Sequence, residues 1–73
     1  MWVYHSPIGD FQIRQLSNGR YGLYFADILW GSWHSPEAAA DDVYMHETSC
    51  YDWDRLDGKL NQVPSNLSEW ERY

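Results

Sequence analysis

The chain has 73 residues, with 11 acidic against five basic side chains and a formal net charge of −6 at pH 7. This length suits one small domain over residues 1–73, and the shortage of Lys and Arg argues against direct binding to nucleic acid or to anionic membranes. The single cysteine, Cys50, leaves no internal disulfide, so we expect a cytoplasmic protein. We expect no membrane segment, because no apolar run could span a bilayer and the chain carries no signal-peptide pattern.

Residues 1–33 predict an antiparallel β-meander of three to four strands. Pro7 and Gly9 mark the first turn. Asn18-Gly19 is the strongest short hairpin signal, because both residues tolerate positive φ, and Ala26-Asp27 makes a short reversal further on. The predicted strands are residues 1–5, 11–14, 21–25 and 28–33.

A two-residue loop at Ala26-Asp27 would also set the strand register. It places Phe25 opposite Ile28, and the expected pairs beyond it are Leu23 with Trp30 and Tyr21 with Ser32. One face of the sheet then carries Phe11, Ile13, Tyr21, Leu23 and Phe25. The opposite face carries Tyr24, Leu29 and Trp33, and a one-residue slip would exchange these assignments.

Residues 35–47 predict one amphipathic α-helix packed across the sheet. Ser35 suits the N-cap, Pro36 suits the first helical position, and Glu37 complements the helix dipole. The expected sheet-facing side chains are Ala39, Ala40, Val43 and His46. The predicted fold class is therefore α+β.

Residues 50–73 predict an irregular C-terminal segment that packs on the core. Short helical turns are expected at residues 51–56 and 68–70. Apolar anchors recur through the segment at Trp53, Leu56, Leu60, Val63, Leu67 and Trp70. Since the helix covers one face of the sheet, the second face needs either this segment or a ligand to cover it.

The run Trp30-Gly31-Ser32-Trp33 followed by residues 35–40 (SPEAAA) resembles a known layout. It is similar to the three-stranded sheet and helix of plant APETALA-type and phage-integrase N-terminal DNA-binding domains, over roughly residues 19–44. In those families Arg and Trp on the free sheet face contact DNA. Here that face offers few basic residues beyond Arg14 and Arg20, so the resemblance implies the layout and not DNA binding.

The whole chain also resembles short uncharacterised bacterial proteins that share the blocks Gly-Arg-Tyr, Gly-Ser-Trp and Tyr-Asp-Trp-Asp. This resemblance implies a fold and no known activity.

Catalytic and metal-binding patterns are weak in this sequence. Asp42, His46 and Cys50 recur every four residues, which would stack them on a continuous helix, but Thr48 and Ser49 are expected to end the helix first. The histidines and Cys50 lack zinc-ligand spacing, and Asp52, Asp54 and Asp57 lack the pattern of a calcium loop. We expect no catalytic residue, no metal and no cofactor, and we identify no small-molecule substrate.

Aromatic residues make up 18% of the chain, more than a domain of this size can bury deeply. Trp and Tyr are enriched at protein interfaces. We therefore expect a non-enzymatic module that binds a protein partner or a second copy of itself. The candidate interface residues are the aromatic Tyr24, Trp33, Trp53 and Trp70, with Asp41 and Asp42 on the helix.

An acidic decoy is the alternative function. A row of carboxylates can imitate a phosphate backbone and occupy a protein that binds DNA or RNA. The residues that would form this row are Asp41, Asp42, Glu47, Asp52, Asp54 and Asp57.

Overall fold

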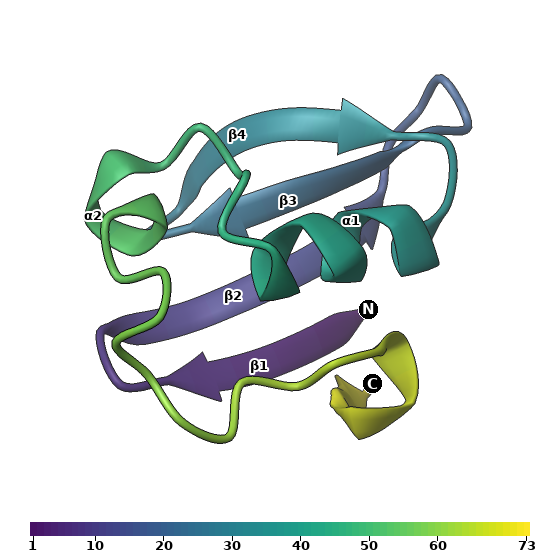
Figure 1. The fold of residues 1–73 in the computed structure, drawn as a ribbon. Helices are drawn as coiled ribbons and strands as arrows, with labels where there is room; N and C mark the ends of the chain where they lie inside the picture. The colour runs from purple at the N-terminus through teal and green to yellow at the C-terminus, as the bar shows by residue number, and fades with distance from the viewer.

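A five-stranded antiparallel sheet forms one layer of the molecule, in the order β4-β3-β2-β1-β5 (Figure 1). The computed structural model describes residues 1–73. The predicted α+β fold is confirmed. The strands are β1 (Trp2–Ser6), β2 (Gly9–Gln15), β3 (Tyr21–Phe25), β4 (Ile28–Trp33) and β5 (Glu71–Arg72).

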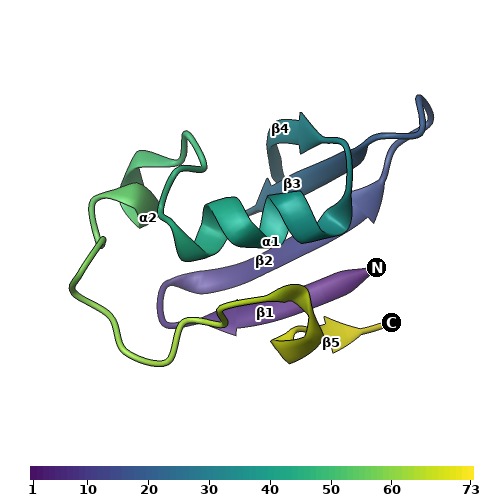
Figure 2. The ribbon, with the colours of Figure 1, turned by 45° about the vertical axis from the view of Figure 1, so that its right-hand side comes forward.

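Strand β5 is one more strand than the sequence predicted. It has two residues and pairs antiparallel with β1, so the two ends of the chain lie side by side (Figure 2). The Tyr73 amide donates to the Met1 carbonyl at 2.7 Å. Two residues are too few to show an alternating pattern, so this strand could not be predicted from periodicity.

The predicted turns form as their residues require. Gly19 has φ +83°, and the Leu16 amide donates to the Arg20 carbonyl at 2.7 Å to close that hairpin. Ala26 and Asp27 both have positive φ, at 53° and 62°, as the two central residues of a type I′ turn must.

The predicted register of β4 holds at its first residues and is wrong beyond Leu29. Phe25 lies opposite Ile28 and Tyr24 opposite Leu29, as this register requires. A bulge then shifts the pairing, and Leu23 lies opposite Gly31 and Tyr21 opposite Trp33. The extra residue of a bulge exchanges the faces of all residues after it. Trp33 therefore packs against the core on the helix side of the sheet, and not beside Tyr24 and Leu29 on the other side.

Helix α1 (Pro36–Tyr44) lies across the sheet (Figures 1 and 2). The Ser35 hydroxyl accepts from the Ala38 amide at 3.1 Å, which confirms the predicted N-cap. Pro36 occupies the first turn, and small residues on the buried side let the helix approach the strands closely. The buried residues of α1 are Pro36, Ala39, Ala40 and Val43.

The helix ends at Tyr44, three residues before the predicted end at residue 47. His46 adopts a left-handed backbone, with φ +56°. The Glu47 amide donates to the Asp42 carbonyl at 2.9 Å, and the His46 amide donates to the Val43 carbonyl at 3.2 Å. These two bonds form a Schellman motif, in which His46 takes the place usually given to glycine.

The C-terminal segment contains α2 (Tyr51–Asp54) and the 3₁₀ turn η1 (Leu67–Glu69), in line with the two short turns expected. This segment packs on the same side of the sheet as α1 (Figure 2). The Trp53 ring lies 4.9 Å from that of Phe11, and the Trp70 ring lies 5.6 Å from that of Tyr4. Of the two covers considered for the second sheet face, this segment is therefore not the one.

The core lies between the sheet on one side and α1 with the C-terminal segment on the other. Its members are Phe11, Ile13, Leu23, Phe25, Ala39, Ala40, Val43, Cys50, Trp53 and Trp70. No helix of the structure has both the length and the apolar character needed to cross a bilayer.

Candidate functional site

Two of the predicted interface residues are part of the core. Trp53 is 0% exposed and Trp70 is 5% exposed, so the prediction that they form an uncovered interface is wrong. The Trp53 indole N–H donates to the Val43 carbonyl at 2.9 Å, which ties α2 to α1. Both residues stabilise the fold, because each large ring removes much apolar surface from water.

Two more of the predicted residues are bonded to each other. The Trp33 indole N–H donates to Asp42 Oδ2 at 2.6 Å, and both side chains are half-buried. This bond ties the end of β4 to α1. Asp41, the preceding residue of the helix, is exposed, and its side chain lies outside this hydrogen bond.

Tyr24 lies on the sheet face that no helix covers. The Arg14 guanidinium sits 4.5 Å from the centre of its ring, a cation–π contact between neighbouring strands. Tyr24 also lines a depression of about 460 Å³ beside the β3–β4 turn. It is the one predicted interface residue found in a hollow of the surface.

His5 joins two carboxylates on the same open face. Its Nδ1 lies 2.8 Å from Asp10, and its Nε2 lies 2.8 Å from Glu71 of β5. Hydrogen bonds to Asp10 and then to Glu71 raise the pKa of His5. The Tyr73 hydroxyl donates to the same Glu71 oxygen at 3.0 Å, and this bond raises the pKa of Tyr73. These hydrogen bonds join the side chains of β5 and Tyr73 to β1 and so stabilise the pairing of β5 with the sheet.

The residues considered for catalysis do not come together. The helix ends before His46, whose Nδ1 bonds to the Trp53 carbonyl and not to Asp42. Cys50 is buried at the start of α2, where its amide donates to the Thr48 hydroxyl. No group of three or more His, Cys, Asp or Glu side chains is arranged to hold a metal ion.

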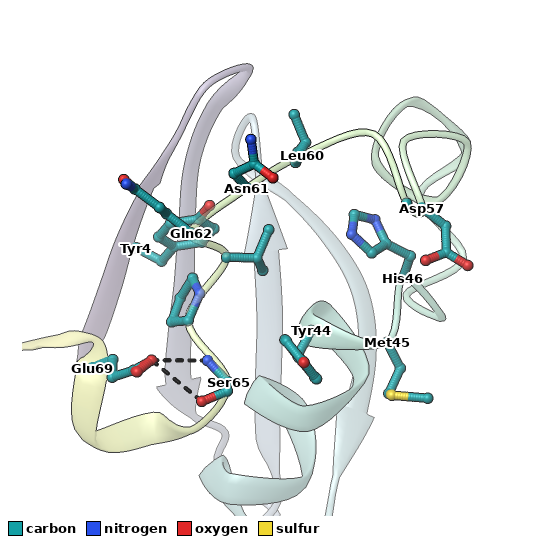
Figure 3. A pocket seen from close by; sticks show the side chains of 13 residues that line it. Tyr4, Tyr44, Met45, His46, Asp57, Leu60, Asn61, Gln62, Ser65 and Glu69 are labelled. Carbon is teal, nitrogen blue, oxygen red and sulfur yellow. Dashed lines mark hydrogen bonds between the residues drawn. The ribbon is translucent and has the colours of Figure 1, made fainter.

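The largest hollow is a groove between the end of α1 and the C-terminal segment, with a volume of about 900 Å³ (Figure 3). One wall is the end of the helix, and the other is the chain over residues 57–65. Tyr4 of β1 and Glu69 of η1 complete it. The lining residues are Tyr4, Tyr44, Met45, His46, Asp57, Gly58, Leu60, Asn61, Gln62, Val63, Pro64, Ser65 and Glu69.

Local backbone chemistry shapes this groove. The left-handed His46 ends the helix and turns the chain away from it. Gly58 and Gln62 also have positive φ, which bends the facing segment around the opening. Leu60 and Val63 pack against the core and Pro64 is buried, so the bent segment is fixed in place.

The groove combines apolar walls with negative charge. Asp57 and Glu69 are its only acidic side chains, and no Lys or Arg lines it. Glu69 Oε1 accepts from the Ser65 amide at 2.9 Å, so this carboxylate has a fixed position (Figure 3). Burial raises the pKa of Tyr4, whose side chain lines the groove.

Comparison with protein-family models, with curated protein sequences and with solved structures finds no match to this chain. The resemblances based on sequence blocks therefore stay predictions.

The groove was not predicted from the sequence, and none of the six predicted interface residues lines it. One signal was available. Tyr44 and Met45 follow the buried Val43 at the end of the helix, and they are 44% and 50% exposed. Exposed apolar side chains that adjoin one another mark a contact surface when they form a continuous patch.

Proposed function

We propose that the protein is a non-enzymatic interaction module that binds a segment of a partner protein in the groove of Figure 3. The observation that carries this proposal is the groove itself. Its volume of about 900 Å³ is large for 73 residues. Sites that hold ligands in proteins enclose roughly 300–1,000 Å³.

The lining favours a protein segment as the ligand. Tyr44 and Met45 offer exposed apolar surface at the rim, and Tyr and Met are enriched in the buried parts of protein interfaces. Asn61, Gln62 and Ser65 offer amide and hydroxyl groups that can pair with a bound backbone. We also propose a cytoplasmic setting, since the only cysteine is free and buried.

The acidic decoy stays a prediction with less support. A decoy needs a row of free carboxylates. Asp42 accepts from Trp33, and Asp54 accepts from the Thr48 and Ser49 amides at 3.0 Å. Two of the six acidic side chains are thus engaged within the fold.

Filling the groove tests the proposal. Asn61→Trp adds a large ring at an exposed lining position, whereas Gln15→Trp adds the same ring at an exposed position of β2 outside the groove. Each variant is used as bait in affinity capture from the native cell. We expect Gln15→Trp to retain the proteins that the parent chain captures and Asn61→Trp to lose them. Equal capture by both variants would contradict the proposal.

A further inference from the structure

We infer that the groove receives an arginine side chain of the partner, at the end formed by His46 and Asp57. This inference rests on the proposed function and names the chemistry of its ligand. Three independent features of the site support it: a fixed acceptor nitrogen, a local excess of negative charge, and an apolar wall for the stem of the side chain.

The acceptor is Nε2 of His46. The Nδ1 atom lies 3.0 Å from the Trp53 carbonyl, and a carbonyl only accepts, so Nδ1 carries the hydrogen. In the neutral imidazole Nε2 is then an acceptor, and the side chain's hydrogen bond within the protein uses the other nitrogen. His46 is only 9% exposed, yet its ring projects into the groove (Figure 3).

The position of this nitrogen is fixed by packing. The imidazole stacks on the Trp53 ring with 4.6 Å between centroids and 14° between planes. Trp53 is fully buried, and the left-handed backbone of His46 is part of the helix end. An acceptor held in this way at the groove surface is preorganised for a donor from a ligand, because little side-chain freedom is lost when the two pair.

The charge near this acceptor favours a cationic donor. Figure 3 shows the exposed Asp57 at the same end of the groove as His46, with Glu69 at the opposite end. The end of α1 adds the negative pole of the helix dipole, and its last turn carries no basic residue to offset it.

Arginine fits this end better than lysine. A guanidinium is planar and carries five N–H donors, so it can donate to an imidazole nitrogen and to a carboxylate together. Its aliphatic stem would pack against apolar side chains of the lining, which include Met45 and Leu60. A second copy of this chain is a poorer occupant, because two molecules of net charge −6 repel each other.

A titration followed by NMR tests the inference on the whole protein. The probe is the peptide acetyl-Ala-Arg-Ala-amide, compared with the same peptide carrying citrulline, which keeps the shape of arginine and lacks its charge. We expect the arginine peptide to move the ¹⁵N resonance of His46 Nε2 and to bind at least tenfold more tightly than the citrulline peptide. The lysine peptide should lie between them.

Matched variants separate the charge from the fold. Asp57→Asn removes an exposed carboxylate of the groove and should weaken the arginine peptide about threefold to tenfold, as expected for one charge-assisted contact. Asp52→Asn removes an exposed carboxylate of α2 outside the groove and should leave binding unchanged. His46→Asn suits the left-handed backbone and should abolish binding. If His46→Asn does not fold, the comparison of Asp57→Asn with Asp52→Asn decides the test.

Three results would overturn the inference. These are no movement of His46 Nε2 with the arginine peptide, equal affinity for arginine and citrulline, and the same shifts on concentrating the protein alone, which would make a second copy the occupant. If the arginine inference fails but Asn61→Trp no longer captures the partner proteins, the proposed function of the groove still stands. If instead Asn61→Trp captures normally while the arginine peptide binds, the arginine site stands and the proposed function fails.

Discussion

We expect the substitution Trp→Phe to be costly at Trp53 and nearly neutral at Trp70, because only the Trp53 indole N–H has a hydrogen-bond partner. In Trp53→Phe the indole N–H that bonds to the Val43 carbonyl is lost, and so is part of a fully buried ring. The lost hydrogen bond contributes about 1 kcal/mol, and the lost burial with its cavity a further 1–2 kcal/mol, by the usual magnitudes. We expect a total loss of about 2–3 kcal/mol in the free energy of unfolding.

Trp70→Phe serves as the matched control. The Trp70 indole nitrogen is buried without a hydrogen-bond partner. A buried donor without an acceptor costs about 1–3 kcal/mol, so its removal offsets the lost ring contact. We expect the free energy of unfolding to change by less than about 1 kcal/mol.

Urea unfolding followed by circular dichroism measures both variants. For a chain of this size the free energy falls by about 1 kcal/mol per molar urea, so the midpoint of Trp53→Phe should drop by about 2–3 M. The midpoint of Trp70→Phe should move by less than about 1 M. Equal losses in the two variants would refute the reasoning from hydrogen-bond satisfaction.

Three further predictions concern the helix, the loop before α2 and the open sheet face. Ser35→Ala removes the N-cap bond to the Ala38 amide and should cost about 1 kcal/mol, lowering Tm by roughly 4–8 °C in a thermal scan; an unchanged Tm would contradict the cap. Asp54→Asn weakens the bonds to Thr48 and Ser49 and should cost about 1–2 kcal/mol, whereas Asp52→Asn should be neutral by the same scan. Hydrogen bonds to Asp10 and Glu71 raise the pKa of His5 in the folded protein. Protonated His5 therefore stabilises β5 fully at pH values below the pKa of an unfolded histidine, about 6.5. This stabilisation is lost as the pH rises through the raised pKa of His5 in the folded protein. The protection of the Tyr73 amide against hydrogen exchange should fall as the pH rises through the pKa of His5, and it should not depend on pH in His5→Gln. Protection that does not change with pH in the parent chain would contradict a role of His5 in holding β5.

Most of the fold follows from local sequence signals. The Asn18-Gly19 hairpin, the Ala26-Asp27 turn and the Ser35 cap each form because the residue chemistry suits the backbone. The bulge in β4 has no such local signal, and the residues it displaces, Trp30 and Trp33, both pack against the core. One extra residue there reversed the predicted face of Trp33.

The candidate site was harder to predict than the fold. Its walls come from the helix end and from a bent segment over residues 57–65 that has no periodic pattern. The early end of the helix depends on a left-handed His46, a residue that the spacing placed inside the helix. The abundance of Trp pointed to an interface, yet packing of α2 and η1 against the sheet buried Trp53 and Trp70.

The most direct test of the groove as the recognition site is photocrosslinking in the native cell. A photoreactive phenylalanine replaces Tyr44, which is 44% exposed and lines the groove, or Tyr51, which is 74% exposed and lies outside it. We expect a discrete crosslinked partner from position 44 and none from position 51, although position 51 is more accessible. Crosslinking of the same partner from position 51 alone, or equally from both positions, would contradict the assignment.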